Sequence, residues 1–97
     1  MKTTNHTPVP WGILEQANDT RTHISNGAHI IATLGTTRTD GSPNHYANAR
    51  LIAAAPELLD ALQFLLADWI AIGGEKLTGS SVPADMARVA IAKATGE

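Results

Sequence analysis

The spacing of apolar and polar positions changes near the middle of the chain, from a strand-like start to a helical remainder. Residues 11–16 (WGILEQ) and the runs RTHIS and AHIIATL, on either side of residues 26 and 27, are rich in residues that favour strands. From about residue 45 onward, apolar residues recur at spacings of three and four, which indicates helices. Strands first and helices afterwards predict an α+β fold.

The pair Asn26 and Gly27 is the clearest turn signal, because Asn-Gly is preferred in two-residue type I′ hairpin turns. Such a turn would place Ser25 opposite Ala28 and His23 opposite Ile30. A two-stranded ribbon is not stable alone, so we expect a three-stranded antiparallel sheet with one face against helices. Residues 35–44 (GTTRTDGSPN) lack periodicity and predict a loop.

The stretch ANARLIAAAPELLDAL (residues 47–62) places a proline inside an otherwise helical pattern. Proline costs about 3 kcal/mol in a helix interior but little in the first turn. We therefore expect an alanine-rich helix over about 45–54, a break or kink at Pro56, and a second helix to about residue 72; one kinked helix is the alternative. After residues 73 and 74, we expect a loop at 75–81 and a third helix from a Ser81 cap to about residue 95.

Ninety-seven residues predict a single domain over 1–97, with residues 1–10 loosely ordered. A core of this size is marginal. The small residues of the helix over 45–54 bury little area, so close neighbours must hold it in place. For both reasons we expect a homo-oligomer.

Composition excludes several classes of protein. The net charge of −2 lacks the basic footprint of a duplex-DNA binder, and the absence of cysteine excludes disulfides and thiolate sites. The longest apolar run, residues 58–72, is interrupted by Asp60, Gln63 and Asp68 and is too polar to span a membrane. We expect a cytoplasmic protein without membrane contact.

The histidines and serines do not predict catalysis. The type I′ register would put His23 and His29 on opposite faces of the hairpin, so they could not share a metal ion. No serine lies in a nucleophile elbow. We therefore expect no enzyme activity, no cofactor and no metal.

Binding of an anionic ligand is the function that the side chains favour most. Three arginines, on the predicted hairpin, in the predicted loop and on the first helix, are expected to converge on an anion, and Trp11, Tyr46 and His23 offer stacking surfaces. The alternative is that these are solvated arginines and core aromatics. The predicted ligand-binding residues are Trp11, Arg21, His23, Arg38, Tyr46 and Arg50.

Residues 47–62 resemble a segment shared by small accessory proteins of bacteriophages and prophages. The closing ARVAIAKATGE (residues 87–97), PWGI near the start and the NG–IIA hairpin also resemble that group. The resemblance implies a viral protein that counters host immunity in the host cytoplasm by non-enzymatic binding. In its sharper form, an oligomer sequesters a nucleotide-type immune signal; the alternative is a protein–protein inhibitor of a host defence complex, similar to an anti-CRISPR protein.

Overall fold

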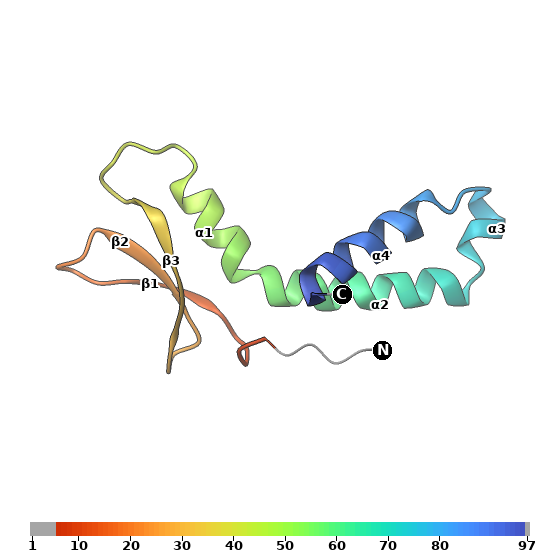
Figure 1. Cartoon of the computed structure of the whole chain (residues 1–97), viewed down its shortest axis with the longest axis horizontal. Coiled ribbons are helices and arrows are strands. Elements are labelled where there is room, and N and C mark those ends of the chain that lie inside the picture. The colour runs from red at the N-terminus through yellow and green to blue at the C-terminus, as the bar shows by residue number, and fades with distance from the viewer. Residues whose placement is uncertain (1–5, 97) are drawn as a thin grey trace. The chain divides into compact units, whose positions relative to one another are not determined.

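The computed structural model describes residues 6–96, which form three strands followed by four helices (Figure 1). Two compact units share the chain: one is His6–Pro56, and the other comprises residues 57–96 of the described part. We describe each unit by itself. The expectation of a loosely ordered start at 1–10 falls partly on residues 1–5, which lie outside the described residues.

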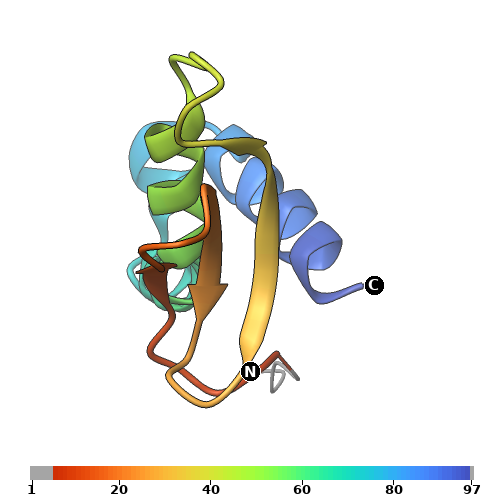
Figure 2. The same cartoon turned by 90° about the vertical axis from the view of Figure 1, so that its left-hand side faces the viewer.

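The first unit is built on an antiparallel sheet of order β1-β2-β3, as expected. Its strands are β1 (Gly12–Glu15), β2 (Arg21–Ser25) and β3 (Ile30–Thr37), with β2 in the centre (Figure 2). The pairing of β1 with β2 is regular and aligns Ile13 with Ile24. The α+β fold predicted from the pattern is therefore confirmed.

The predicted hairpin register is wrong, because the connection between β2 and β3 is longer than two residues. Ser25 pairs with Ile30 rather than with Ala28, and two irregularities shift the rest, so that His23 pairs with Thr33. A type I′ turn needs a positive φ at both central residues, but within residues 6–96 only glycines have one. Instead, Asn26 Oδ1 accepts hydrogen bonds from the backbone N–H groups of residues 28 and 29.

The loop predicted over residues 35–44 is shorter than expected, since β3 continues to Thr37. The remaining turn is organised by Asp40, whose carboxylate accepts hydrogen bonds from the backbone N–H groups of Thr37 and Ser42, both at 2.8 Å. These two donors hold the pKa of the Asp40 carboxyl below its ordinary value. The turn leads directly into helix α1 (His45–Ala53).

The core of this unit lies between α1 and one face of the sheet. Ile24 and Ala49 are fully buried, and Leu34 is nearly so. Because Ala49, the buried residue in the middle of α1, carries only a methyl group, the helix backbone can approach the strands closely. Trp11, Ala32, Ile52 and Ala53 pack around this cluster. Of the small residues of α1, Ala49 and Ala53 thus have the close neighbours that their size predicted, whereas Ala47 is exposed.

The expected break before Pro56 is present and is one residue wide. Helix α1 ends at Ala53, and helix α2 (Ala55–Ala71) begins after Ala54, whose N–H still donates to the Arg50 carbonyl at 3.0 Å. Pro56 therefore lies in the first turn of α2, where its missing N–H costs little. Helix α2 begins at Ala55, one residue before the proline at which the break was expected.

The second unit contains most of α2 together with α3 (Gly74–Thr78) and α4 (Val82–Thr95). The predicted loop over 75–81 is wrong in part, because residues 74–78 form the short helix α3. Gly96 ends α4 in a left-handed conformation, as expected. Ser81 stands at the start of α4, but its hydroxyl oxygen accepts no hydrogen bond from a backbone N–H group of the helix; the hydroxyl donates to the Asp85 carboxylate instead.

Residues 57–96 bury no large apolar side chain. Their buried residues are Gln63, Gly74 and Ala84, while the large apolar side chains are half-buried or exposed. None of the helices within residues 6–96 has both the length and the apolar character to cross a membrane.

Candidate functional site

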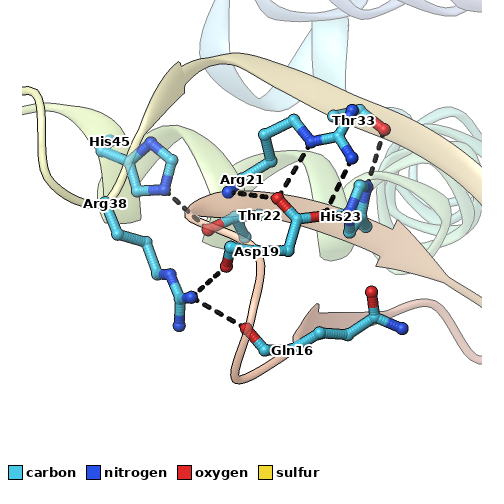
Figure 3. Close-up of polar contacts among 8 residues, drawn as sticks. All are labelled: Gln16, Asp19, Arg21, Thr22, His23, Thr33, Arg38 and His45. Atoms are coloured by element: carbon cyan, nitrogen blue, oxygen red, sulfur yellow. Dashed lines mark hydrogen bonds and ion pairs between the residues drawn. The ribbon is translucent and has the colours of Figure 1, made fainter.

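Three of the six predicted binding residues meet at Asp19 in the turn before β2, two of them at its carboxylate and one at its backbone carbonyl (Figure 3). Arg21 donates to Asp19 through Nε at 2.9 Å, through Nη2 at 3.0 Å and through its backbone N–H at 2.9 Å. His23 Nε2 lies 3.0 Å from the same carboxylate. Arg38 donates to the Asp19 backbone carbonyl. Arg21 and His23 therefore meet at an anion that the chain itself supplies, and Arg38 contacts the backbone of the same residue.

The Asp19 carboxylate is strongly stabilised in its charged form. The Arg21 guanidinium contributes most, followed by the Arg21 backbone N–H and by His23, and together they hold the pKa of Asp19 well below its usual range. The same ion pair raises the pKa of Arg21. The Asp19 side chain is 17% exposed, whereas that of Arg21 is 60% exposed. Arg21 thus keeps solvent access while its charge is compensated.

Arg38 holds the turn between β1 and β2 in place. Its guanidinium donates to Glu15 Oε2 at 2.9 Å and to the Gln16 carbonyl at 3.0 Å, in addition to the Asp19 carbonyl. Its side chain is 23% exposed. These contacts use most of the donors of the guanidinium, which has five N–H groups.

The remaining predicted residues lie elsewhere in the same unit. Trp11 donates through Nε1 to the Thr7 carbonyl at 3.0 Å and meets the His6 ring edge-on. Tyr46, 43% exposed, stacks edge-on against His45. Arg50 is exposed on α1. These side chains do not join the cluster around Asp19, so the six predicted residues do not line one pocket.

The two buried histidines are bridged to hydroxyl groups. His45, at the start of α1, lies 2.7 Å from Thr22 Oγ1 through Nε2 and 2.6 Å from Thr36 Oγ1 through Nδ1. His23 Nδ1 lies 2.7 Å from Thr33 Oγ1. The strand threonines thus satisfy imidazole nitrogens that burial would otherwise leave without partners. His45 joins α1 to β2 and β3.

A cavity of about 660 Å³ opens in the helical unit, where the end of α2, α3 and the start of α4 meet. Small-molecule sites commonly occupy about 300–1,000 Å³. Its lining combines one aromatic ring, three charged side chains and three glycines, with apolar residues between them. The lining residues are Trp69, Ile70, Gly73, Gly74, Glu75, Lys76, Gly79, Ala84 and Arg88.

The glycine pair holds Trp69 in the cavity wall. Gly73 has a φ of 73°, a left-handed conformation that ends α2. Gly74 has a different role, because a Cβ at this position would stand 2.1 Å from Cε2 of the Trp69 ring. Only glycine lets the indole lie directly against the backbone at the start of α3.

The charges at this cavity favour an anionic group. Lys76 and Arg88 supply two positive charges and Glu75 one negative charge. Arg88 also donates to Asp85 Oδ1 at 3.2 Å, but both side chains are more than half exposed. An ion pair this exposed contributes about 0–1 kcal/mol, so a ligand anion can replace it at small cost.

Sequence reasoning missed this cavity because its residues come from three helices. By itself, the motif GGEK at residues 73–76 predicts only the end of a helix followed by a loop. A signal was nevertheless present: Trp69, two adjacent glycines and Lys76 fall within eight residues. What the pattern could not indicate is that α4 brings Arg88 to the same place.

The described part of the chain, residues 6–96, contains no group of three or more His, Asp or Glu side chains placed to hold a metal ion. The predicted register placed His29 in a strand, on the other face of the hairpin from His23. In the structure His29 lies in the turn before β3.

Comparison with known proteins identifies the setting of this fold. The chain is a phage protein, as its resemblance to phage accessory proteins predicted. It belongs to the family of Salmonella phage P22 protein Y8K6, whose family model matches residues 1–97. No curated protein and no solved structure matches the chain.

Proposed function

We propose that this phage protein acts in the host cytoplasm by binding, without turnover, a small anionic ligand of the nucleotide type. The observation that carries the proposal is the cavity at the end of the helical unit, with Trp69 in its wall and Lys76 and Arg88 at its border. An indole offers a stacking surface to a base, and the two cations attract phosphate.

The lining of the cavity favours capture over catalysis. Its nine residues include neither a histidine nor a hydroxyl side chain, so they do not offer a hydroxyl nucleophile activated by histidine. Membership in a phage family gives capture a purpose. Sequestration of a nucleotide-type immune signal would protect the phage without any chemical step.

The test is isothermal titration of the full chain with a panel of linear and cyclic nucleotides. We expect one-site binding to at least one member, and recovery of that ligand unchanged after long incubation. An absence of heat with every nucleotide at high micromolar concentration would refute the proposal, and conversion of the ligand would replace capture by catalysis.

Two arginine variants locate the site. Arg88→Gln removes a charge from the cavity, whereas Arg50→Gln removes an exposed charge from α1, where the sequence predicted a contact. We expect the first to weaken binding about tenfold or more and the second to leave the affinity unchanged. The reverse result would assign the binding site to residues 6–56, the unit that contains the sheet and Arg50.

Inhibition of a host defence protein is a second candidate, favoured by one exposed ring. Phe64 is 70% exposed on α2, with Asp60 and Asp68 one turn away on either side. An aromatic anchor between two carboxylates suits a basic pocket on a protein partner. A stoichiometric partner captured by the wild-type chain but not by Phe64→Ala would support inhibition over sequestration.

A further inference from the structure

The helical unit has an apolar groove that its own chain leaves open. The groove runs between α2 and α4, and every side chain that lines it is apolar: Leu62, Leu65, Leu66, Trp69, Pro83, Ala84 and Ala87. Its internal volume is only about 100 Å³. A space this narrow suits side chains inserted from another helix better than a free ligand.

The apolar surface continues beyond the groove on both helices. Leu58 lies seven residues before Leu65, and therefore on the same side of α2, and Met86 lies three residues after Pro83 on α4. Leu58 is 52% exposed, Leu65 65% and Met86 68%. Since residues 57–96 bury no large apolar side chain of their own, this face is the missing half of a core.

We propose that a second copy of the same unit covers this face. The α2–α4 pair of one copy then stacks on the α2–α4 pair of the other, groove to groove around a two-fold axis. Each α2 lies against α4 of the partner in a bundle of four helices. The proposal gives the expected homo-oligomer a specific face, and it does not depend on the nucleotide site.

Charge favours a second copy as the occupant. Helix α2 carries Glu57, Asp60 and Asp68 and no basic residue, whereas α4 carries Arg88 and Lys93 against Asp85. In the stacked arrangement each acidic α2 has a more basic α4 on both sides, one from its own chain and one from the partner. None of these charged residues lines the apolar groove, so the charges of the two helices complement one another outside it.

The required area also favours stacking over contact along one helix. A specific interface buries about 800 Å² per partner. The 14 residues of α4 make a rod only about 21 Å long and about 10 Å wide. Contact along α4 alone falls far short of such an area, and α2 and α4 side by side come closer to it because they offer about twice the width.

The experiment is sedimentation equilibrium of the full chain without ligand. Leu65→Glu and Met86→Glu place a charge on the face from α2 and from α4, respectively. Leu77→Glu is the matched control, because Leu77 is 73% exposed on α3 and does not line the groove. Far-ultraviolet circular dichroism checks that each variant retains its helices at the concentration used.

We expect the wild type and Leu77→Glu to sediment as dimers at tens of micromolar. Each groove variant should raise the dimer dissociation constant at least tenfold. Wild-type chain that stays monomeric at these concentrations would overturn the proposal, as would a dimer that both groove variants leave intact or that Leu77→Glu disrupts equally. If one groove variant unfolds, the other decides. Because Trp69 and Ala84 line both the groove and the cavity, the dimer is measured without ligand, and Arg88→Gln tests nucleotide binding separately.

Discussion

At the scale of single residues, the cluster around Asp19 gives the sheet unit a measurable response to acid. Arg21 contributes most to the stabilisation of the Asp19 carboxylate. Arg38 does not contact this carboxylate and reaches Asp19 only at its backbone carbonyl. The two arginines lie near the same residue but have different electrostatic effects on it. This difference provides a variant and its matched control.

We expect Arg21→Gln to raise the pKa of Asp19 toward the value of about 3.9 found in unfolded chains. A carboxyl whose pKa is lowered by folding adds stability that is present above its unfolded pKa and is lost as pH falls toward the folded value. The wild type should therefore lose stability below about pH 4, and Arg21→Gln should lose less. NMR titration of the Asp19 carboxyl and denaturant unfolding at several pH values measure the two effects.

The control is Arg38→Gln, which removes a contact to the Asp19 carbonyl and leaves the carboxylate partners in place. The pKa of Asp19 should stay low in this variant, although the turn loses part of its support. If both variants raise the pKa equally, the hydrogen bonds of Arg21 are not its main cause.

At the scale of elements, the fit of α1 on the sheet depends on one methyl-sized position. Ala49 is fully buried against the cluster that contains Ile24 and Leu34, whereas Ala47 on the same helix is exposed. Two identical substitutions therefore distinguish packing from helix propensity.

Ala49→Leu should destabilise the sheet unit by about 1–3 kcal/mol, because three extra carbons must enter a filled space. Ala47→Leu makes the same chemical change on the exposed side and should stay within about 0.5 kcal/mol of the wild type. Chemical denaturation, followed through a spectroscopic signal from residues 6–56, measures the free energy of unfolding of both variants. Equal effects of the two substitutions would mean that α1 does not pack on the sheet as described.

At the scale of the whole molecule, the two units differ in how they obtain their stability. Residues 6–56 bury Ile24 and Leu34 within one chain, whereas residues 57–96 leave their large apolar side chains half-buried or exposed. If a second copy completes the helical unit, its stability depends on protein concentration by mass action. The sheet unit does not share this dependence.

Amide exchange therefore should slow in α2 and α4 as the protein concentration rises, while exchange at Ile24 and its neighbours in β2 stays constant. Hydrogen exchange read by mass spectrometry at about 1 and 100 µM measures the difference. In Leu65→Glu the concentration dependence should disappear. Slowing in both units together would assign the contact to another part of the chain.

The sequence by itself determined the fold class, the break between α1 and α2 beside Pro56, and the phage setting. These features rest on local chemistry: apolar spacing, the geometry of proline and a recognisable segment around residues 47–62. It also placed Arg21 and Arg38 near one another, but Asp19, which both contact, lies in a turn without periodicity.

Only the tertiary structure decided the hairpin register and the position of the cavity. The register depends on whether Asn26 adopts a positive φ or accepts hydrogen bonds through its side chain, and the sequence permits both. The cavity exists because α4 returns to place Arg88 near Trp69, 19 positions earlier in the chain. Local spacing predicts the long helices. The distance between Trp69 and Arg88, which lie on different helices, depends on how those helices pack.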